Sequence, residues 1–356
     1  MDLIFSDMPL PDKVTGTIFL AGPSPRTADQ KDWRHEAVNE LMALGYTGTV
    51  FIPRWANDFY NEKTDKVFEY DDQIEWEYKA RKMSDQIVFW VARDLTANFP
   101  GFITNFELGE DFNTNKIVYG RPDWAERCRY MDVRAGLKKM PIHTALKESL
   151  AAAVGYIKEG ALRSNAETRI PLLVWRTKTF QSWYHNIRAH SNMLLDASVE
   201  YVRLLSDKSV FSFALQAEVW IADESRSKKD ELVFARPDIS TVVPHYTDAD
   251  GCTYLVMVEE FRTATRNNIG KNLEFPGGSH QDITKTDLDI AVEELHEECG
   301  LNIHPSRLGY KGSRQIAASY SSHHMHIYEI RLTEHEFLKL LKSANDEEIF
   351  GNTGIG

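Results

Sequence analysis

The stretch QIVFWVA, at residues 86–92, decides the fold of the N-terminal half of the chain. After its first residue it is continuously apolar and rich in β-branched and aromatic side chains, which is typical of a strand buried on both faces of a parallel sheet. Similar short runs occur on both sides of it, namely TIFLAG at residues 17–22, TVFIP at 49–53 and KIVYG at 116–120. Together they predict a buried parallel sheet.

The segments between these runs have helical periodicity. In residues 32–44 the side chains of Trp33, Ala37, Leu41 and Leu44 recur every three or four positions. Residues 73–83 and 145–157 are also expected to be helical, and another helix is expected to begin at residue 105. Because strands alternate with helices, we expect an α/β fold with a doubly wound parallel sheet and helices on both faces.

The second half of the chain has a different texture. From about residue 210 the apolar segments are longer and extended, and polar turns separate them, including DADG at residues 248–251, a strong hairpin signal. One clear helix follows at residues 287–299. We expect a second domain at residues 208–356 with a mixed or antiparallel sheet, a first domain at 1–160, and a lead-in segment at 161–207. Residues 180–205 are expected to be helical or irregular.

Composition limits the possible functions. The 356 residues carry a formal net charge of −12, so sequence-independent binding to a nucleic-acid polymer is not expected, although a local site for a small phosphorylated ligand is. Three distant cysteines make a disulfide scaffold implausible. No stretch reaches the roughly 18–20 apolar residues of a membrane span, and the N-terminus is unlike a signal peptide. A soluble cytoplasmic protein without membrane partners is the expectation.

Polar clusters follow the strands of the predicted sheet at their carboxyl ends, where ligands bind in open α/β folds. They are GPSPR at residues 22–26, ARD at 92–94 and GFITNFELGE at 101–110. The candidate residues in them are Gly22, Pro23, Arg26, Arg93, Asp94, Thr104, Asn105 and Glu107. Glu107 is the most notable, and its alternative interpretation is a first-turn carboxylate that stabilises its helix. Arg26 is either an anion ligand or a solvated surface residue.

Five stretches in this order resemble the nucleoside 2-deoxyribosyltransferase-like family. They are FLAGPSPR, the Trp76-Glu77 pair, SDQIVFWVARD, TNFELG and GRPDWAERCRYMD, the last at residues 120–132. The resemblance implies a flavodoxin-like sheet and makes Glu107 the nucleophile that attacks C1′ of a nucleoside or nucleotide. It also implies a homo-oligomer, because family members complete this site with a neighbouring subunit.

The departing base needs a proton, so a second acid is expected near Glu107. Candidates are Glu77, Asp94 and, as a less favoured turn residue, Asp85. The segment GPSPR would contact the sugar or a 5′-phosphate. The chain departs from the family where Phe19 replaces a tyrosine, and the loop at residues 100–104 lacks an Asp-x-Gly-Thr pattern. Hydrolysis of the N-glycosidic bond and base exchange therefore both stay open.

The helix expected at residues 287–299 carries four glutamates. Glu294, Glu297 and Glu298 share one helical face, where like charges cost about 0.2–0.5 kcal/mol per pair. A hard divalent cation reverses this cost because it favours carboxylate oxygens. The alternative is a solvated acidic helix.

This helix, together with VEEFR at 258–262 and EFPGG at 274–278, resembles the Nudix hydrolase family. The resemblance implies a mixed-sheet α/β/α sandwich and hydrolysis of a nucleoside diphosphate derivative that depends on Mg²⁺ or Mn²⁺. Glu294, Glu297 and Glu298 would bind the metal, with Glu298 also catalytic, while Arg262 and Glu274 would bind substrate.

The Nudix-like motif is degenerate in its first half. Glu293 stands in place of the family's arginine, and the early glutamate position falls at Thr284 or Lys285. That Glu and Arg normally pair, so their joint loss predicts a structural replacement. Three nearby histidines, at positions 323, 324 and 326, are more consistent with surface residues than with a zinc site.

The two resemblances together predict a bifunctional enzyme of nucleotide metabolism. The competing hypothesis is a sensor, in which the degenerate second domain binds a nucleotide or ADP-ribose without hydrolysis and regulates the first. The chain ends at IFGNTGIG, earlier than the second resemblance implies.

Overall fold

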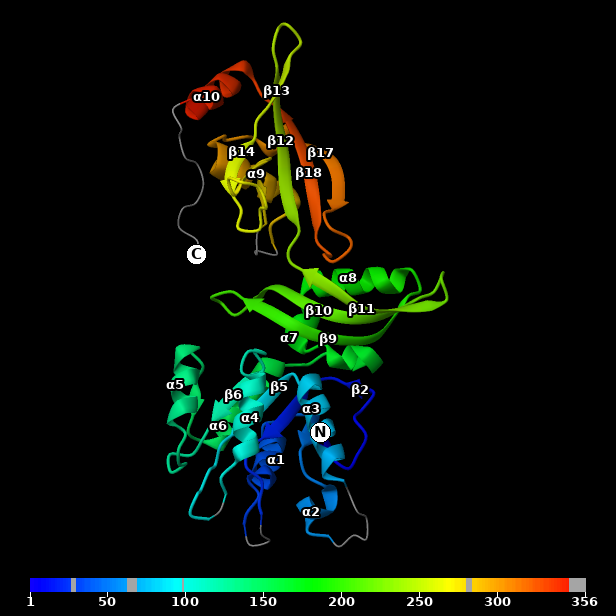
Figure 1. Ribbon diagram of the computed structural model, residues 1–356, viewed down its shortest axis with the longest axis vertical. Coiled ribbons are helices and arrows are strands. Elements are labelled where there is room, and N and C mark those ends of the chain that lie inside the picture. Colours follow the sequence, from blue (N-terminus) through cyan, green and yellow to red (C-terminus); the bar gives the residue numbers. More distant parts are fainter. Residues whose placement is uncertain (27–29, 63–68, 98, 280–283, 346–356) are drawn as a thin grey trace. The chain divides into compact units, whose positions relative to one another are not determined.

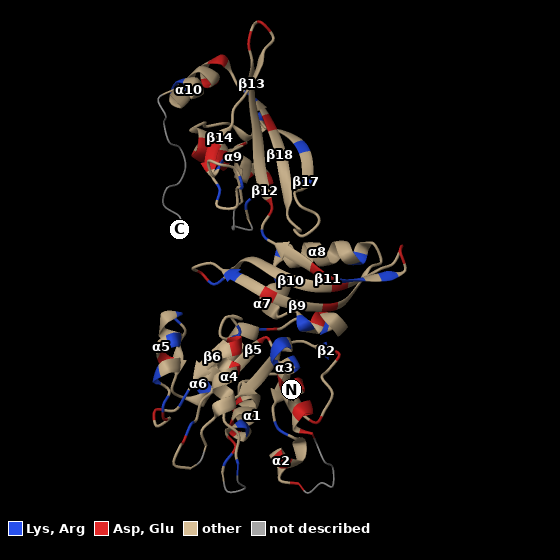
Figure 2. Ribbon diagram, viewed as in Figure 1, with Lys and Arg blue, Asp and Glu red and all other residues tan. Residues whose placement is uncertain are grey.

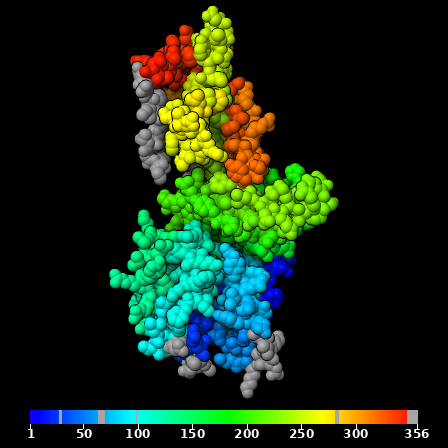
Figure 3. Space-filling view, viewed as in Figure 1, coloured from blue at the N-terminus to red at the C-terminus, as the bar shows by residue number. Residues whose placement is uncertain are grey.

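The computed structural model describes the chain except for residues 27–29, 63–68, 98, 280–283 and 346–356. It divides into two compact units, Met1–Leu204 with Phe213–Leu232 and Leu205–Ser212 with Val233–Gly356. Figure 1 shows the elements of each unit, and the space-filling view shows the blue and cyan segments of the first unit closely packed (Figure 3). No helix in the described ranges is both long and apolar enough to cross a membrane.

A six-stranded sheet forms the centre of the first unit, and its paired strands run parallel. The predicted buried runs are its middle strands. The order is β1 (Asp2–Phe5), β4 (Thr49–Ile52), β3 (Thr17–Ala21), β5 (Gln86–Trp90), β6 (Ile117–Gly120) and β7 (Ile142–His143). All residues of β3, β4, β5 and β6 are buried, as expected for strands covered on both faces.

Helices cover both faces of this sheet, so the doubly wound α/β expectation is confirmed. Alternate strand residues enter two separate apolar clusters, for example Val88 in one and Phe89 in the other. The first cluster contains α1 (Trp33–Ala43) and α6 (Leu146–Ile157), and the second contains α3 (Tyr70–Met83), α4 (Phe102–Asp111) and α5 (Arg129–Leu137). The short α2 (Ala56–Tyr60) adds Phe59 to the first cluster.

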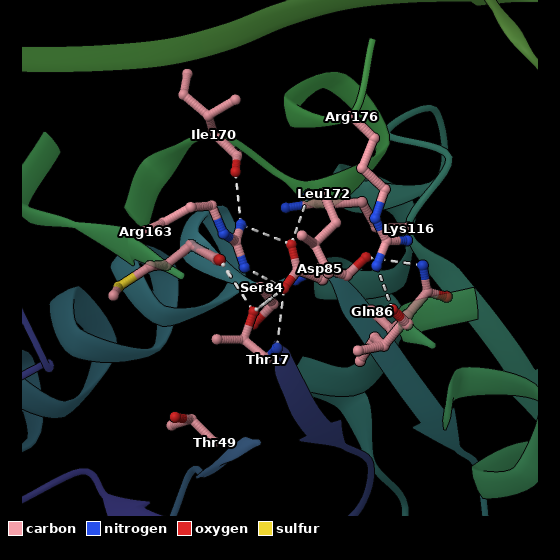
Figure 4. Close-up of polar contacts among 12 residues, drawn as sticks. Thr17, Thr49, Ser84, Asp85, Gln86, Lys116, Arg163, Ile170, Leu172 and Arg176 are labelled. Carbon is pink, nitrogen blue, oxygen red and sulfur yellow. Dashed lines mark hydrogen bonds and ion pairs between the residues drawn. The ribbon is translucent and has the colours of Figure 1, made fainter. Parts of the chain in front are cut away.

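A buried polar network fastens the segment after α6 to the amino ends of the strands (Figure 4). Asp85, which precedes β5, accepts hydrogen bonds from the backbone N–H of Thr17 and of Leu172, at 2.9 and 2.7 Å. It also forms an ion pair with Arg163 at 2.6 Å, and both side chains are almost fully buried. Arg163 belongs to β8 (Arg163–Ser164), which pairs with β2 (Lys13–Val14), and Leu172 begins α7 (Leu172–Trp175). Asp85 is therefore a structural residue.

A second sheet of the first unit has the order β11-β10-β9, with β9 (Met193–Leu204), β10 (Val210–Ile221) and β11 (Arg226–Ala235). The helix α8 (Lys178–Ala189) contributes Phe180, whose ring lies 6.3 Å from that of Phe213 in β10. The expectation that residues 180–205 are helical or irregular is wrong over β9. The charged residues of this strand obscured its alternation of more and less exposed positions.

The sheet of the second unit is mixed, as expected. The strand β12 (Ile239–Thr247) runs parallel to β18 (His324–Arg331) and antiparallel to β13 (Thr253–Leu255) and β16 (Gly277–Gly278). The predicted hairpin at residues 248–251 joins β12 to β13. The remaining strands are β17 (Gly309–Gln315), which pairs with β18, and the separate ribbon of β14 (Val258–Phe261) and β15 (Lys271–Glu274).

Two helices build the core of this unit with the mixed sheet. The predicted helix is observed as α9 (Asp287–Cys299), with Thr286 as its N-cap and Gly300 in the left-handed conformation that ends it. Leu295 of α9 and Leu340 of α10 (Glu334–Asn345) enter one cluster with Val242 and Tyr328 of the sheet. The predicted functional domain limits at residues 160 and 208 differ from the limits of the compact units and stay predictions.

Candidate active site

The loop after β3 is held by the buried side chain of Arg34, on α1. Its guanidinium donates to the carbonyl oxygens of Leu20 at 3.0 Å and Gly22 at 2.8 Å, and it lies 3.2 Å from a carboxylate oxygen of Asp32. Gly22 permits this close approach, because a Cβ there would lie 2.3 Å from the carbonyl oxygen of Trp90. The start of the predicted GPSPR loop is thus fixed at the carboxyl edge of the sheet.

This loop meets the start of α4. A Cβ on Gly101, the N-cap residue with φ +58°, would lie 2.7 Å from Cγ of Pro23 and 3.4 Å from Oγ1 of Thr104. The structure therefore brings the predicted residues Gly22, Pro23 and Thr104 into one region. Thr104 itself is buried.

Glu107 lies in the second turn of α4 and is 7% exposed. No acidic residue occupies the first turn of this helix, so the interpretation of Glu107 as a first-turn stabilising carboxylate does not hold. Burial, followed by the nearby charge of Glu77, raises the pKa of Glu107 to about 7, while Arg81 acts in the opposite direction. A carboxyl group with this pKa exchanges its proton near neutral pH.

Glu77 reaches Glu107 from the neighbouring helix α3, and the two carboxyl groups share a hydrogen bond. An oxygen of Glu77 also accepts a hydrogen bond of 2.8 Å from the side-chain amide of Gln73, one helical turn earlier. Burial raises the pKa of Glu77, although Gln73 partly offsets this effect. The structure thus brings together the predicted nucleophile and one of its predicted proton donors.

Arg81 completes this cluster and was not predicted from the sequence. Its Nε lies 3.5 Å from Oε1 of Glu107, and its Nη2 lies 2.6 Å from Oε2 of Glu110. It also pairs with Asp111, and its own side chain is 6% exposed. The only available signal was spacing, because Arg81 follows Glu77 by four positions and so lies on the same face of α3.

Asp94 and Arg26 lie elsewhere, on the lining of a cleft of about 1260 Å³ that also includes Trp33 and Trp124. One oxygen of Asp94 accepts hydrogen bonds from the hydroxyl and backbone of Thr96, which lower the pKa of Asp94. Such a carboxylate is ionised at neutral pH and is a poor proton donor. The geometry therefore favours Glu77 over Asp94 as the acid.

Arg93 and Asn105 are in direct contact near the end of β5. The guanidinium of Arg93 donates to the side-chain oxygen of Asn105 and, at 3.1 Å, to the carbonyl oxygen of Arg127. Arg93 is 5% exposed. Its visible role is to tie α4 to the segment before α5, and any substrate contact stays a prediction.

In the second unit, α9 presents its glutamates to the strand β16. The backbone N–H of Gly277 donates to Glu298 at 2.9 Å, and a Cβ on Gly278 would lie 2.1 Å from a carboxylate oxygen of Glu294. Burial and the charges of Glu298, Glu297 and Glu293 raise the pKa of Glu294 to about 7. A set of mutually repelling carboxylates fits the chemistry of a hard divalent cation.

The predicted metal ligands are nevertheless not gathered around a point. Among the described residues, no group of three or more His, Cys, Asp or Glu is arranged to hold one ion. Glu297 is exposed, and the histidine His326 lies between the carboxylates of Asp238 and Asp287, at 3.5 and 3.4 Å. Metal binding by α9 therefore stays a prediction.

The predicted substrate residues Arg262 and Glu274 are in contact with each other. Arg262 lies 2.8 Å from a carboxylate oxygen of Glu274 and 2.5 Å from one of Glu260. The hydrogen bonds from Arg262 lower the pKa of Glu274. A phosphate bound by Arg262 would therefore compete with carboxylates that already hold it.

Glu293, in α9, has a cationic partner in the segment that precedes the helix. The ammonium of Lys285 lies 2.7 Å from both carboxylate oxygens of Glu293. This ion pair connects the segment before α9 to the helix. That it is the expected replacement for a Glu–Arg pair stays a prediction.

Comparison with known proteins supports the assignment of the first unit. Residues 15–123 match the model of the family described as "Nucleoside 2-deoxyribosyltransferase like". This segment contains Glu77, Arg81 and Glu107, and the match supports a transferase or glycosidase in nucleotide metabolism. No curated protein matches the chain.

Among solved structures, the chain is similar to one described as "Crystal structure of ADP compounds hydrolase", with 18% sequence identity and a TM-score of 0.29. The similarity covers 39% of this chain and 66% of that chain, slightly less than two thirds of its length. A TM-score this low supports no statement about substrate.

Proposed function

We propose that the first unit cleaves or exchanges the N-glycosidic bond of a nucleoside or nucleotide, with Glu107 as nucleophile and Glu77 as proton donor. The observation that carries this proposal is the buried, hydrogen-bonded pair of these two carboxyl groups beside Arg81. Such a pair holds one proton and one negative charge near neutral pH. The proposed reaction needs one protonated carboxyl group, as the acid, and one ionised carboxyl group, as the nucleophile.

In the proposed reaction, an oxygen of ionised Glu107 attacks C1′ while the bond between C1′ and the base nitrogen breaks. The electrons of that bond pass to the base, which takes the proton of Glu77. Water or a second base then attacks C1′ of the glycosyl ester and releases Glu107. When water attacks, ionised Glu77 accepts its proton, so the pair returns to its starting state.

The raised pKa of Glu107 places the proton of the resting pair on Glu107. The proposed reaction therefore requires this proton to pass to Glu77 when substrate binds, and the contact of Arg81 with Glu107 would favour that transfer. Pro23 and Thr104 would face the sugar, and Arg26 would bind a 5′-phosphate from its position on the neighbouring cleft. Assembly with a second copy stays part of the proposal.

For the second unit we propose hydrolysis of a nucleoside diphosphate derivative. Glu294, Glu297 and Glu298 would hold Mg²⁺ or Mn²⁺, and the bound ion would supply charge neutralisation and an activated water. Arg262, with Glu274, would contact the substrate at its phosphate. The raised pKa of Glu294 supports this assignment, because a cation would relieve the repulsion that causes it.

The test is chromatography of products after incubation with nucleosides, nucleotides, NAD and ADP-ribose, with and without Mg²⁺. Free base should form without metal, and Glu107→Ala should abolish it, whereas Glu110→Ala, in the same helix, should not. Monophosphates should form only with Mg²⁺ and disappear in a Glu294→Gln, Glu298→Gln variant. Addition of a second base separates exchange from hydrolysis. Free base formation that survives Glu107→Ala contradicts the assignment.

One observation favours a sensor as the second candidate for this unit. Among the described residues, the carboxylates of α9 are not arranged around an ion, and Arg262 is already held by carboxylates. A sensor would bind ADP-ribose or a nucleotide without turnover and change the rate of base release by the first unit. Monophosphate production with Mg²⁺ would exclude a purely sensory role.

A further inference from the structure

A second pocket of the first unit includes in its lining Glu110, which lies one helical turn after Glu107 on α4. It occupies about 670 Å³, within the range of small-molecule sites. The pocket lies near the amino ends of the strands, because its lining includes Lys116, which precedes β6, and Met83, the last residue of α3. The residues 197–202 of β9 form another wall.

The pocket is strongly basic in an acidic protein. Five cationic residues line it, which are Lys79, Lys82, Lys116, Lys138 and Arg169. Only two carboxylates, Glu110 and Glu200, line it as well, and Glu110 is paired with Arg81. Lys79 is paired with Glu75 and Arg169 with Asp196, so the local excess of positive charge comes from Lys82, Lys116 and Lys138. In a chain with a net charge of −12, this excess favours anions.

Three of these lysines also stabilise the structure. The ammonium of Lys116 donates to the carbonyl oxygens of Arg81 and Lys82, at 2.7 and 3.1 Å, and Lys138 donates to the carbonyl oxygen of Phe112 at 2.7 Å. Lys82 lies over the ring of Tyr78, with its nitrogen 5.5 Å from the ring centroid. These contacts explain how the ammonium groups are positioned.

The hydrogen bonds to carbonyl oxygens do not neutralise the charge of these lysines. In the described part of the chain, none of Lys82, Lys116 and Lys138 forms an ion pair with a carboxylate, although an ammonium group has three donors. Burial lowers the pKa of Lys116 to about 8, against the opposing charges of Asp111 and Asp85. A bound anion would add to the compensation that these two carboxylates provide.

Aromatic side chains at the pocket give a second recognition element. Tyr78 and Tyr201 both line it and are 45% and 52% exposed. Their rings offer surfaces on which a planar base can stack, while the lysines contact phosphate oxygens. The basic residues in the last turn of α3 are coloured blue in Figure 2.

From these observations we infer that this pocket is a binding site for a nucleoside diphosphate, distinct from the candidate active site. Lys82 and Lys138 bind the diphosphate, the buried charge of Lys116 attracts it, and Tyr78 or Tyr201 contacts the base. The site does not depend on the proposed reaction, because it shares neither Glu77 nor Glu107 with it.

The experiment measures the reactivity of individual lysines toward an acylating reagent by mass spectrometry, with EDTA present to exclude cation-dependent binding. The probes are ADP and inorganic diphosphate. Both should reduce the labelling of Lys82 and Lys138 several-fold and leave the exposed Lys178 unchanged. Stronger protection by ADP would show the contribution of the base.

Two variants make the result specific. Lys82→Glu should abolish the protection of Lys138, whereas the same charge change in Lys178→Glu should leave it intact. Glu200→Gln removes a carboxylate from the pocket and should increase affinity for ADP a few-fold by calorimetry. Unchanged labelling with both probes, or protection of Lys138 that persists in Lys82→Glu, would overturn the site.

Discussion

Replacement of Glu107 by glutamine should stabilise the first unit in a manner that depends on pH. The variant keeps the shape of the side chain and removes its charge. In the folded protein the pKa of Glu107 is about 7, against an ordinary value of 4.5. Since each pKa unit corresponds to 1.36 kcal/mol, ionisation of this buried group costs about 3 kcal/mol of folding free energy.

The sign of this pH dependence follows from whether the folded or the unfolded chain holds the proton of Glu107. Between pH 4.5 and pH 7 the folded chain retains a proton on Glu107 that the unfolded chain has lost. The associated stability is complete below pH 4.5 and is lost as the pH rises through 7. Glutamine has no proton to lose, so Glu107→Gln should match the wild type at pH 4.5 and exceed it by about 3 kcal/mol at pH 8.

Tryptophan fluorescence during urea unfolding measures this effect selectively. All eight tryptophans belong to the first unit, at positions 33, 55, 76, 90, 124, 175, 183 and 220. The control is Glu110→Gln, because Glu110 also contacts Arg81 from the same helix but is one-third exposed. A stability difference for Glu107→Gln that does not change with pH, or a loss at pH 8, would refute the argument.

Three further perturbations have defined outcomes. Asp85→Asn should lower the free energy of unfolding by about 3–5 kcal/mol in the same fluorescence assay, because it leaves the fully buried Arg163 without its ion-pair partner; a loss below about 1 kcal/mol would contradict this. Lys285→Glu should lower the free energy of unfolding by up to about 1 kcal/mol, and addition of Glu293→Lys should restore this loss. If the effects of the two substitutions simply add in the double-mutant cycle, the two side chains are not coupled. Mg²⁺ binding should tighten from pH 6 to pH 8 and release protons in calorimetry, because the pKa of Glu294 is about 7; pH-independent affinity would remove Glu294 from the ligand set.

The sequence predicted the four middle strands of the first sheet because their signal is local, whereas the edge strands β1 and β7 were not predicted. Continuous apolar runs such as residues 86–92 identify strands buried on both faces without reference to any neighbour. The strand β9 has no such signal, since Asp196 and Glu200 interrupt its apolar positions. Its strand conformation depends on pairing with β10.

The residues of the candidate site also divide into those that have a local sequence signal and those that have none. Glu77 and Glu107 were predicted from motifs, but Arg81 contacts residues 26 to 30 positions later in the chain, and no local pattern indicates such a contact. The structural role of Asp85 was hidden for the same reason, because its partner Arg163 lies 78 positions away. The ion pair between Lys285 and Glu293 became visible only when their side chains were seen in contact.

The division of the chain into compact units has a consequence for any attempt to isolate one activity. The chain passes from the first compact unit to the second after Leu204, returns to the first after Ser212, and enters the second again after Leu232. A gene fragment that ends at residue 207 would lack β10 and β11, and its complement would carry those strands without β9. Division after Leu232 keeps most of the three-stranded sheet together and transfers only residues 205–212 to the other fragment. Two fragments divided at that point are the natural pair for co-expression and complementation.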